Sequence, residues 1–285
     1  TNKPMKSLTQ RILLIIGIFV AGIVTLSAQQ FEGKAIYQSA RKMGEFSIKA
    51  EGVTPEMEAQ LRQQMAKQFQ REYELTFNLT ESIWKEEESL GGGPATASAG
   101  GMMIQVQSAG GGLTYKNTAE NLFMQETEVF GKPFLVKDEL EPKEWELTQE
   151  SKKIGNYTAY KAIYTDYREG MSMSFNSDED QNEMEKVIDT IKIEAWYTPD
   201  IPVSQGPSNF WGLPGLIMEV NDGSMSYVCT KVILNPEDKI KIKRPNKGKE
   251  VTREELRIIT EEKTQEMMKK YSNGGGDVTI KIGRG

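Results

Sequence analysis

Histidine is absent from the 285 residues of this chain, and cysteine occurs once, at Cys229. The lack of histidine excludes Ser-His-Asp and Cys-His catalysis and every zinc site built on imidazole. A single cysteine excludes an internal disulfide, a thiolate metal cluster and a redox pair within the chain. Carboxylate pairs remain available among the 41 acidic residues, but no spacing singles out a pair. We therefore expect that the protein is not an enzyme. If it were one, the chemistry that these residues still allow is that of a lysine- or aspartate-based hydrolase.

The chain also lacks any block of basic residues, and its net charge is −6. A nucleic-acid partner is therefore not expected. The acidic stretch 177–185 resembles a calcium-binding loop in spacing, but Glu183 stands where the template needs glycine and Asp189 where it needs glutamate. We interpret this stretch as a solvated acidic turn, and we expect no metal and no cofactor. Cys229 alternates with Tyr227 in a strand-like run, and we expect it to be a small core residue.

The apolar run from Ile12 to Leu26 follows basic residues and leads to a small-residue exit at Ser27-Ala28. This pattern is typical of a secretory signal peptide, and the run is shorter than the roughly 20 residues that a bilayer requires. We expect residues 1–28 to be a signal peptide cleaved near Ala28-Gln29. The mature protein, residues 29–285, would then lie in the periplasm, free or associated with the outer membrane, without a transmembrane span.

Two segments carry signals for the start of a helix. Thr54-Pro55-Glu56 combines an N-cap, a proline at the first helical position and an acid at the positive end. Thr252 and Glu255 form a capping box. An apolar stripe at four-residue steps follows the first signal: Met57, Leu61, Met65 and Phe69. We predict helices over residues 55–72 and 252–271.

Alternating apolar and polar residues predict strands elsewhere. They cover residues 31–37, 73–80, 114–117, 122–129, 145–149, 157–165, 191–197, 216–220, 225–234 and 278–282. Their short spacing favours antiparallel connections, and Asp222-Gly223 indicates a hairpin with a type I′ turn. Residues 91–112 are rich in glycine and are expected to be a flexible insert. We therefore expect one α+β domain, mainly a curved antiparallel sheet with two covering helices.

Between the predicted strands 191–197 and 216–220 lies a segment, Pro199 to Gly215, that is rich in both Pro/Gly and large apolar residues. Proline lacks the amide donor and glycine costs backbone entropy, so no helix or central strand can run through it. Yet it is too apolar for a solvated linker. Such a loop can be ordered only if most of its apolar side chains pack, either on this protein or on a partner.

Residues 212–217 read GLPGLI, and this string resembles the motif of the GLPGLI family of Bacteroidetes envelope proteins. The segments 196–199, 201–202, 206–207 and 154–157 are also similar to that family. We assign the structural motif to Trp196, Gly212, Gly215, Leu216 and Ile217. The resemblance implies an envelope location without an assigned activity. Members of that family tend to be encoded beside TonB-dependent outer-membrane receptors, so the resemblance makes such a receptor the candidate partner.

Two non-enzymatic functions follow from this reading. In the first, an accessory protein docks an outer-membrane protein through its loop. The partner-binding residues would be Pro207, Phe210, Trp211, Leu213 and Pro214, whereas Trp196 and Leu216 would be anchored in the core. In the alternative, a curved sheet encloses an apolar ligand and the protein is a periplasmic carrier. A third possibility is that the loop has only a structural role and closes one end of the sheet. Exposed loop aromatics favour docking, aromatics around a roomy cavity favour the carrier, and fully buried aromatics favour neither.

Overall fold

The computed structural model describes residues 31–41, 70–87, 95–99, 102–106, 112–174 and 183–272, together with residues 54 and 56. Contacts divide the chain into Thr1–Phe31 and one compact unit, Glu32–Gly285. The expected signal peptide (1–28) and the expected last strand (278–282) lie outside the described residues. So does most of the first expected helix, of which Glu56 is helical, whereas Glu72 already begins a strand.

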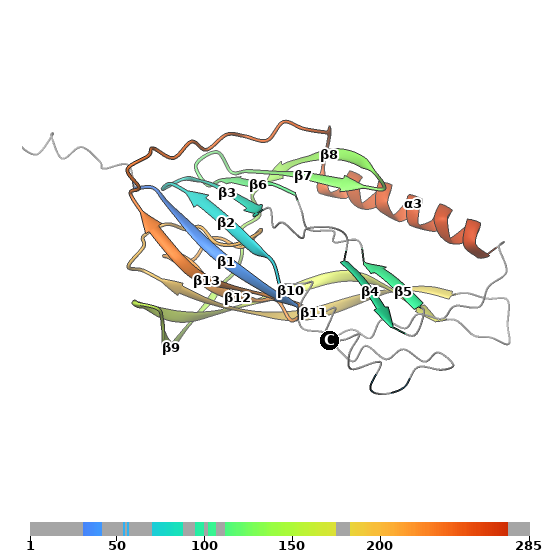
Figure 1. The fold of residues 1–285 in the computed structure, drawn as a ribbon, viewed down its shortest axis with the longest axis horizontal. Helices are drawn as coiled ribbons and strands as arrows, with labels where there is room; N and C mark the ends of the chain where they lie inside the picture. The colour runs from blue at the N-terminus through green and yellow to red at the C-terminus, as the bar shows by residue number, and fades with distance from the viewer. Residues whose placement is uncertain are drawn as a thin grey trace, which may run out of the picture. The chain divides into compact units, whose positions relative to one another are not determined.

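Twelve strands form one sheet, in the order β14-β8-β7-β6-β3-β2-β1-β13-β12-β11-β10-β9 (Figure 1). The strands are β1 (Gly33–Arg41), β2 (Glu72–Phe77), β3 (Glu81–Glu86), β6 (Thr114–Asn117), β7 (Leu122–Val129), β8 (Lys132–Glu139), β9 (Glu146–Ile154), β10 (Tyr157–Ser174), β11 (Glu183–Thr198), β12 (Leu216–Asn221), β13 (Met225–Leu234) and β14 (Lys249–Val251). All their pairings are antiparallel except that of β14 with β8, which is parallel.

The prediction of an α+β fold with two covering helices is wrong. Apart from the helical residue Glu56 and a two-stranded sheet, the described residues form one large mixed sheet and one helix, α3 (Arg253–Ser272). Leu256 and Ile259 pack against a cluster that includes Phe134 and Val251, so α3 is anchored near its N-terminus. The capping box is present, because the Glu255 N–H donates to Thr252 Oγ1 at 3.1 Å and the Thr252 N–H to Glu255 Oε2 at 2.7 Å. No helix among the described residues is long and apolar enough to cross a membrane.

The glycine-rich insert also differs from the expected loop. Two strands within it, β4 (Ala95–Ala99) and β5 (Met102–Val106), pair with each other in antiparallel fashion. The apolar run at 102–106, which interrupts the glycines and serines, supplies one of these strands. The prediction gave the glycine content of this segment too much weight and the β-forming tendency of the short apolar run too little.

The predicted hairpin between β12 and β13 is present, but its turn is not of type I′. That type needs a positive φ at both central residues, and within the loop 222–224 only Gly223 has one, at 86°. The Asp222 carboxylate instead accepts hydrogen bonds from the backbone N–H groups of Ser224 and Met225, at 3.1 and 2.7 Å. A three-residue loop with glycine in the left-handed region results.

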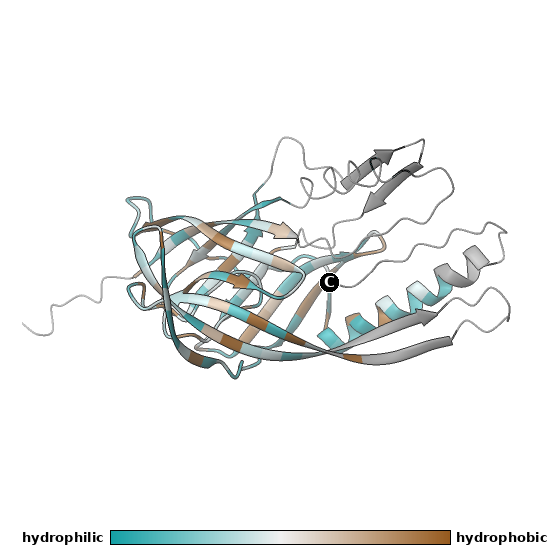
Figure 2. Ribbon diagram, turned by 90° about the horizontal axis from the view of Figure 1, so that it is seen from below, coloured by the Kyte–Doolittle hydropathy of each residue, from teal (hydrophilic) through white to brown (hydrophobic). Residues whose placement is uncertain are grey.

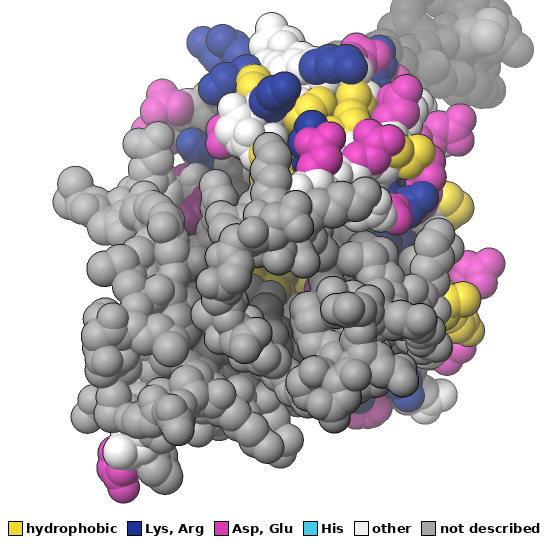
Figure 3. Space-filling view, turned by 90° about the vertical axis from the view of Figure 1, so that its right-hand side faces the viewer, with side chains coloured by type: hydrophobic (Ala, Val, Ile, Leu, Met, Phe, Trp, Pro, Cys, Tyr) yellow, Lys and Arg dark blue, Asp and Glu magenta, His cyan; other side chains and the backbone are white. Residues whose placement is uncertain are grey.

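Alternating burial gives the sheet two distinct faces, as in β2 and β3. Along the strands, hydrophobic and hydrophilic residues are interspersed (Figure 2). In β2, Tyr73, Leu75 and Phe77 are buried. The register places Phe77, Ser82, Lys116 and Phe123 side by side across β2, β3, β6 and β7. We call the face that carries this row the inner face. On the described part of the side seen in Figure 3, acidic and basic side chains lie interspersed with hydrophobic ones.

Candidate functional site

The segment from Pro199 to Gly215, here called the crossing loop, joins β11 to β12 and packs on the inner face of the sheet. It folds back on itself, because the Gly212 N–H donates to the Ser204 carbonyl at 3.2 Å. The first half of the loop is fixed at Gln205, whose backbone carbonyl accepts a hydrogen bond from the Ile217 N–H at 3.0 Å. The Gln205 side chain is fully buried and accepts a 2.7 Å hydrogen bond from Ser82 Oγ on β3. The loop is therefore part of the core and contacts strands far from its own in the sheet order.

Lys116 on β6 holds the tip of the crossing loop. Its side chain is fully buried, and its ammonium donates to the carbonyl oxygens of Gly206, Ser208 and Phe210 at 2.7, 2.7 and 2.9 Å. Burial lowers the pKa of this ammonium well below its usual value, and nearby Lys143 lowers it further. The three carbonyls act in the opposite direction, because they bind the charged form. All three donors of the ammonium are thus used by one loop.

The GLPGLI residues have mostly structural places. Gly212 has a φ of 95°, a conformation that favours glycine. A Cβ on Gly215 would lie 2.2 Å from the Thr198 carbonyl oxygen. Leu213, Leu216 and Ile217 are fully buried. Pro214 is exposed, so it is the side chain of the motif that packing does not explain.

Phe210 and Leu213 pack in one cluster on the inner face, here called the loop cluster: Ala162, Ile193, Ala195, Tyr197, Phe210, Leu213, Ile217 and Val220. Phe210 is 3% exposed. Its side chain is therefore not accessible to a partner in this structure. Pro207 is buried as well. Of the five expected partner-binding residues, Trp211 and Pro214 keep exposed surface.

Trp211 links the loop cluster to a second cluster of buried side chains on the inner face. It packs against the cluster that includes Phe123 and Phe134, and its indole N–H donates to the Glu141 carbonyl at 3.1 Å. Its own carbonyl accepts the indole N–H of Trp145 at 2.8 Å, and Trp145 packs on the loop cluster. The side chain of Trp211 is partly buried, so one part anchors the loop and another faces solvent.

Trp196 does not lie in the core, contrary to expectation. It alternates with the buried Ala195 and Tyr197, which places it on the outer face of β11. There the Lys152 ammonium lies 4.2 Å from the centre of its ring. Alternation correctly identified the strand, but the place of Trp196 at the strand end was wrongly taken to anchor it in the core. Leu216, the other expected anchor, is fully buried.

Two exposed side chains that the sequence did not single out border the loop cluster. Tyr160 on β10 pairs with Tyr197, their rings 6.2 Å apart, and Leu147 on β9 pairs with Ala162. Tyr160 is 38% exposed and Leu147 57% exposed. Both lie in segments correctly predicted as strands, but alternation cannot tell which positions of a buried face remain uncovered at its border. We call Leu147, Tyr160, Trp211 and Pro214 the docking rim.

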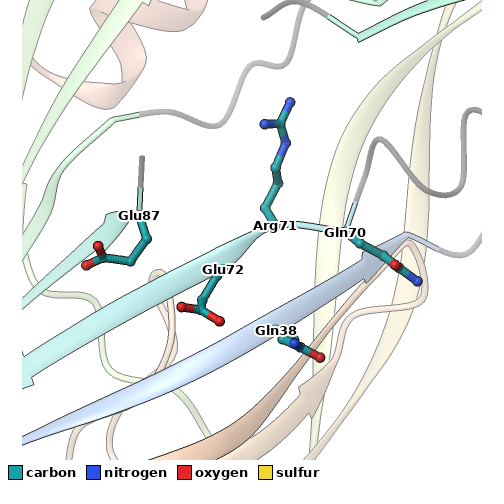
Figure 4. A pocket seen from close by; sticks show the side chains of 5 residues that line it. All are labelled: Gln38, Gln70, Arg71, Glu72 and Glu87. Atoms are coloured by element: carbon teal, nitrogen blue, oxygen red, sulfur yellow. The ribbon is translucent and has the colours of Figure 1, made fainter. Parts of the chain in front are cut away.

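A polar pocket of about 290 Å³ lies at the ends of β1, β2 and β3 and is lined by Gln38, Gln70, Arg71, Glu72 and Glu87. Figure 4 shows that these side chains point in different directions and do not converge. None of the loop aromatics lines this pocket. Among the described residues, no group of three or more His, Cys, Asp or Glu side chains could hold a metal ion.

Comparison with known proteins gives limited similarity. A family model described as "Protein of unknown function (Porph_ging)" matches residues 145–219, which include β9 to β11 and the crossing loop. No curated protein matches the chain. Two solved structures, of PNGF-II in the P21 and C2 space groups, are 18% and 17% identical, with TM-scores of 0.44 and 0.45. They match 81% of this chain, which spans only 33% and 32% of the PNGF-II chains. Over residues 145–219, the chain is thus similar to a Bacteroidetes-associated family of unknown function.

Proposed function

We propose that this chain is a GLPGLI-family accessory protein of the periplasm, without enzymatic activity, that docks an outer-membrane protein through its docking rim. The observation that carries the proposal is the exposure of Leu147 and Tyr160, 57% and 38%, beside an anchored loop. Single exposed apolar side chains are ordinary on protein surfaces. Here Leu147 and Tyr160 border the loop cluster through their strand pairings with Ala162 and Tyr197. Pro214 follows Leu213 of that cluster in the chain, and Trp211 is linked to it through the hydrogen bond from Trp145. Grouped aromatic and apolar side chains of this kind favour a protein partner.

The anchoring of the crossing loop supports docking, because a partner need not order the surface it binds. Lys116 binds the tip of the loop, and Ser82 donates to the Gln205 side chain in its first half. The indole N–H of Trp145 donates to the carbonyl of Trp211. Pre-ordered side chains spare the entropy that binding would otherwise cost, about 0.5–1.5 kcal/mol for each immobilised side chain. The proposed docking surface is therefore the docking rim, and Phe210 and Leu213 anchor the crossing loop from within.

An outer-membrane protein, with a TonB-dependent receptor as the candidate, is the partner that the family resemblance suggests. Two observations support this choice of site and compartment. The family match covers residues 145–219, which contain every residue of the docking rim. The run from Ile12 to Leu26, with its basic flank, has the pattern of a secretory signal.

A matched pair of tyrosines on β10 tests the proposal. Tyr160 belongs to the rim, whereas Tyr167 is 70% exposed and lies on the opposite face, because the two are an odd number of residues apart. The Tyr160→Ser variant should lose association with purified outer membranes, by tenfold or more in apparent affinity, and lose no more than about 1 kcal/mol of stability. Tyr167→Ser should bind as the wild type does. Equal binding by all three proteins, measured by co-sedimentation, would contradict the proposal.

A further inference from the structure

We propose that the tip of the crossing loop is a cation-binding cradle, and that Lys116 supplies the cation from the chain's own sheet. Lys116 would then be a positioning residue for the docking rim. The inference deepens the proposed function, on which its role for the rim rests, but the cradle itself can be tested without a partner.

The geometry of the contact resembles the coordination of an ion more than an ordinary ion pair. The carbonyl oxygens of residues 206, 208 and 210 converge on one ammonium at 2.7–2.9 Å. Buried lysines usually face a carboxylate, but all three hydrogen bonds that the structure gives Lys116 go to backbone carbonyls. Converging carbonyls replace the hydration shell of a cation in the same way in ion-selective filters.

The loop conformation that aims these carbonyls is not a relaxed one. The Phe210 N–H donates to the Pro207 carbonyl at 3.0 Å, which closes a turn over residues 207–210. Inside that turn, Ser208 has a φ of 51°, a region that side-chain-bearing residues rarely adopt. Three carbonyl dipoles pointing at one place also repel one another. A positive charge at their centre compensates for both, so we expect the turn to require an occupied cradle.

The cradle lies immediately before Trp211, the first docking-rim residue of the crossing loop. Phe210 supplies the last of the three carbonyls, and Trp211 follows it directly. The next residue, Gly212, forms the hydrogen bond to Ser204 that closes the loop on itself. Loss of the cation should therefore loosen residues 204–215 as one unit and displace the side chain of Trp211. The sheet beneath, which has its own ladder hydrogen bonds, should remain intact.

Chemical rescue provides the test. Lys116→Ala removes the ammonium together with three methylene groups, a volume that n-propylammonium restores. Hydrogen exchange, followed by mass spectrometry, should show amides of residues 204–215 exchanging at least tenfold faster in Lys116→Ala than in the wild type. Amides of β10 and β11 should be unchanged. Adding n-propylammonium should restore protection, whereas tetramethylammonium, which has no N–H donor, should not. The control is Lys137→Ala on β8, where the lysine is exposed and pairs with Glu250.

Wild-type exchange in residues 204–215 of Lys116→Ala would overturn the inference, and so would rescue by both ammonium ions alike. If Lys116→Ala fails to fold, Lys116→Met and Lys116→Arg decide the question, because both keep the side-chain volume. The cradle requires at least tenfold better loop protection in Lys116→Arg; equal protection in the two variants overturns it. These readouts involve no partner. A protected loop that still fails to bind outer membranes would refute the proposed function and leave the cradle standing.

Discussion

Replacing Phe210 with alanine should destabilise the protein strongly, because this side chain anchors the crossing loop from within. Phe210 is 3% exposed and packs among Leu213, Ile217 and their neighbours in the loop cluster. Truncating a buried phenylalanine to alanine costs about 3–5 kcal/mol, through lost burial and the cavity left behind. The cost falls when the surroundings can collapse into the cavity.

Collapse is opposed at this position. The backbone of Phe210 is held at both ends, by its N–H on Pro207 and by its carbonyl on Lys116. We therefore expect the upper part of the range, about 4–5 kcal/mol. For a domain of this size, that loss lowers the unfolding temperature by about 8–20 °C.

Urea unfolding followed by circular dichroism measures this difference, and an unchanged m-value shows that the unfolding transition is the same one. Tyr160→Ala is the control, because its side chain is 38% exposed and its loss should cost about 1 kcal/mol or less. A loss below about 1 kcal/mol for Phe210→Ala would show that the loop cluster does not anchor the loop, and the reasoning would fail.

Two further predictions concern backbone and thiol chemistry. Gly215→Ala places a Cβ 2.2 Å from the Thr198 carbonyl at a φ of 153°, and should cost about 3 kcal/mol or more. Gly155→Ala, at a φ of 56° with open space around it, should cost only about 1–2 kcal/mol in the same unfolding assay; equal losses would contradict the clash. Burial raises the pKa of the Cys229 thiol from 9.0 to about 12. The folded protein therefore retains a proton that the unfolded chain releases, so stability should fall as the pH rises above about 9. At pH 8, a disulfide reagent should label the folded protein much more slowly than the urea-unfolded one; equal rates would refute the burial of the thiol.

Most individual strands could be predicted from the sequence, because alternation directly reflects a sheet with one buried face. The segment 73–80 illustrates this in part, since β2 buries Tyr73, Leu75 and Phe77 but ends at Phe77, and Leu79 is 50% exposed. The predicted share of helix in the fold was too large. Capping signals indicate where a helix can begin, but they do not measure how much of it the core covers, and α3 packs on the sheet through Leu256 and Ile259.

The sequence indicated that the crossing loop could be ordered only if most of its apolar side chains pack, and Ile201, Phe210 and Leu213 are indeed buried. Which of them face inward could not be predicted, because that depends on strands far away in the sequence. Lys116 is the clearest case: in the sequence it is an ordinary polar residue in a short strand, and the ninety residues that separate it from Gly206 carry no sign of the contact. Leu147 and Tyr160 were missed for the same reason, since exposure at the border of a buried face is set by neighbouring strands.

Site-specific photocrosslinking tests the central claim, docking through the rim, most directly. A benzophenone side chain at position 147, which is 57% exposed on the rim, is compared with one at position 167, which is 70% exposed on the opposite face. Irradiation of cells that retain their native envelope, followed by mass spectrometry of the adducts, identifies the neighbours of each position. The account predicts one outer-membrane protein attached at position 147 and absent at position 167. The same protein attached equally at both positions, or attached only at position 167, would contradict it.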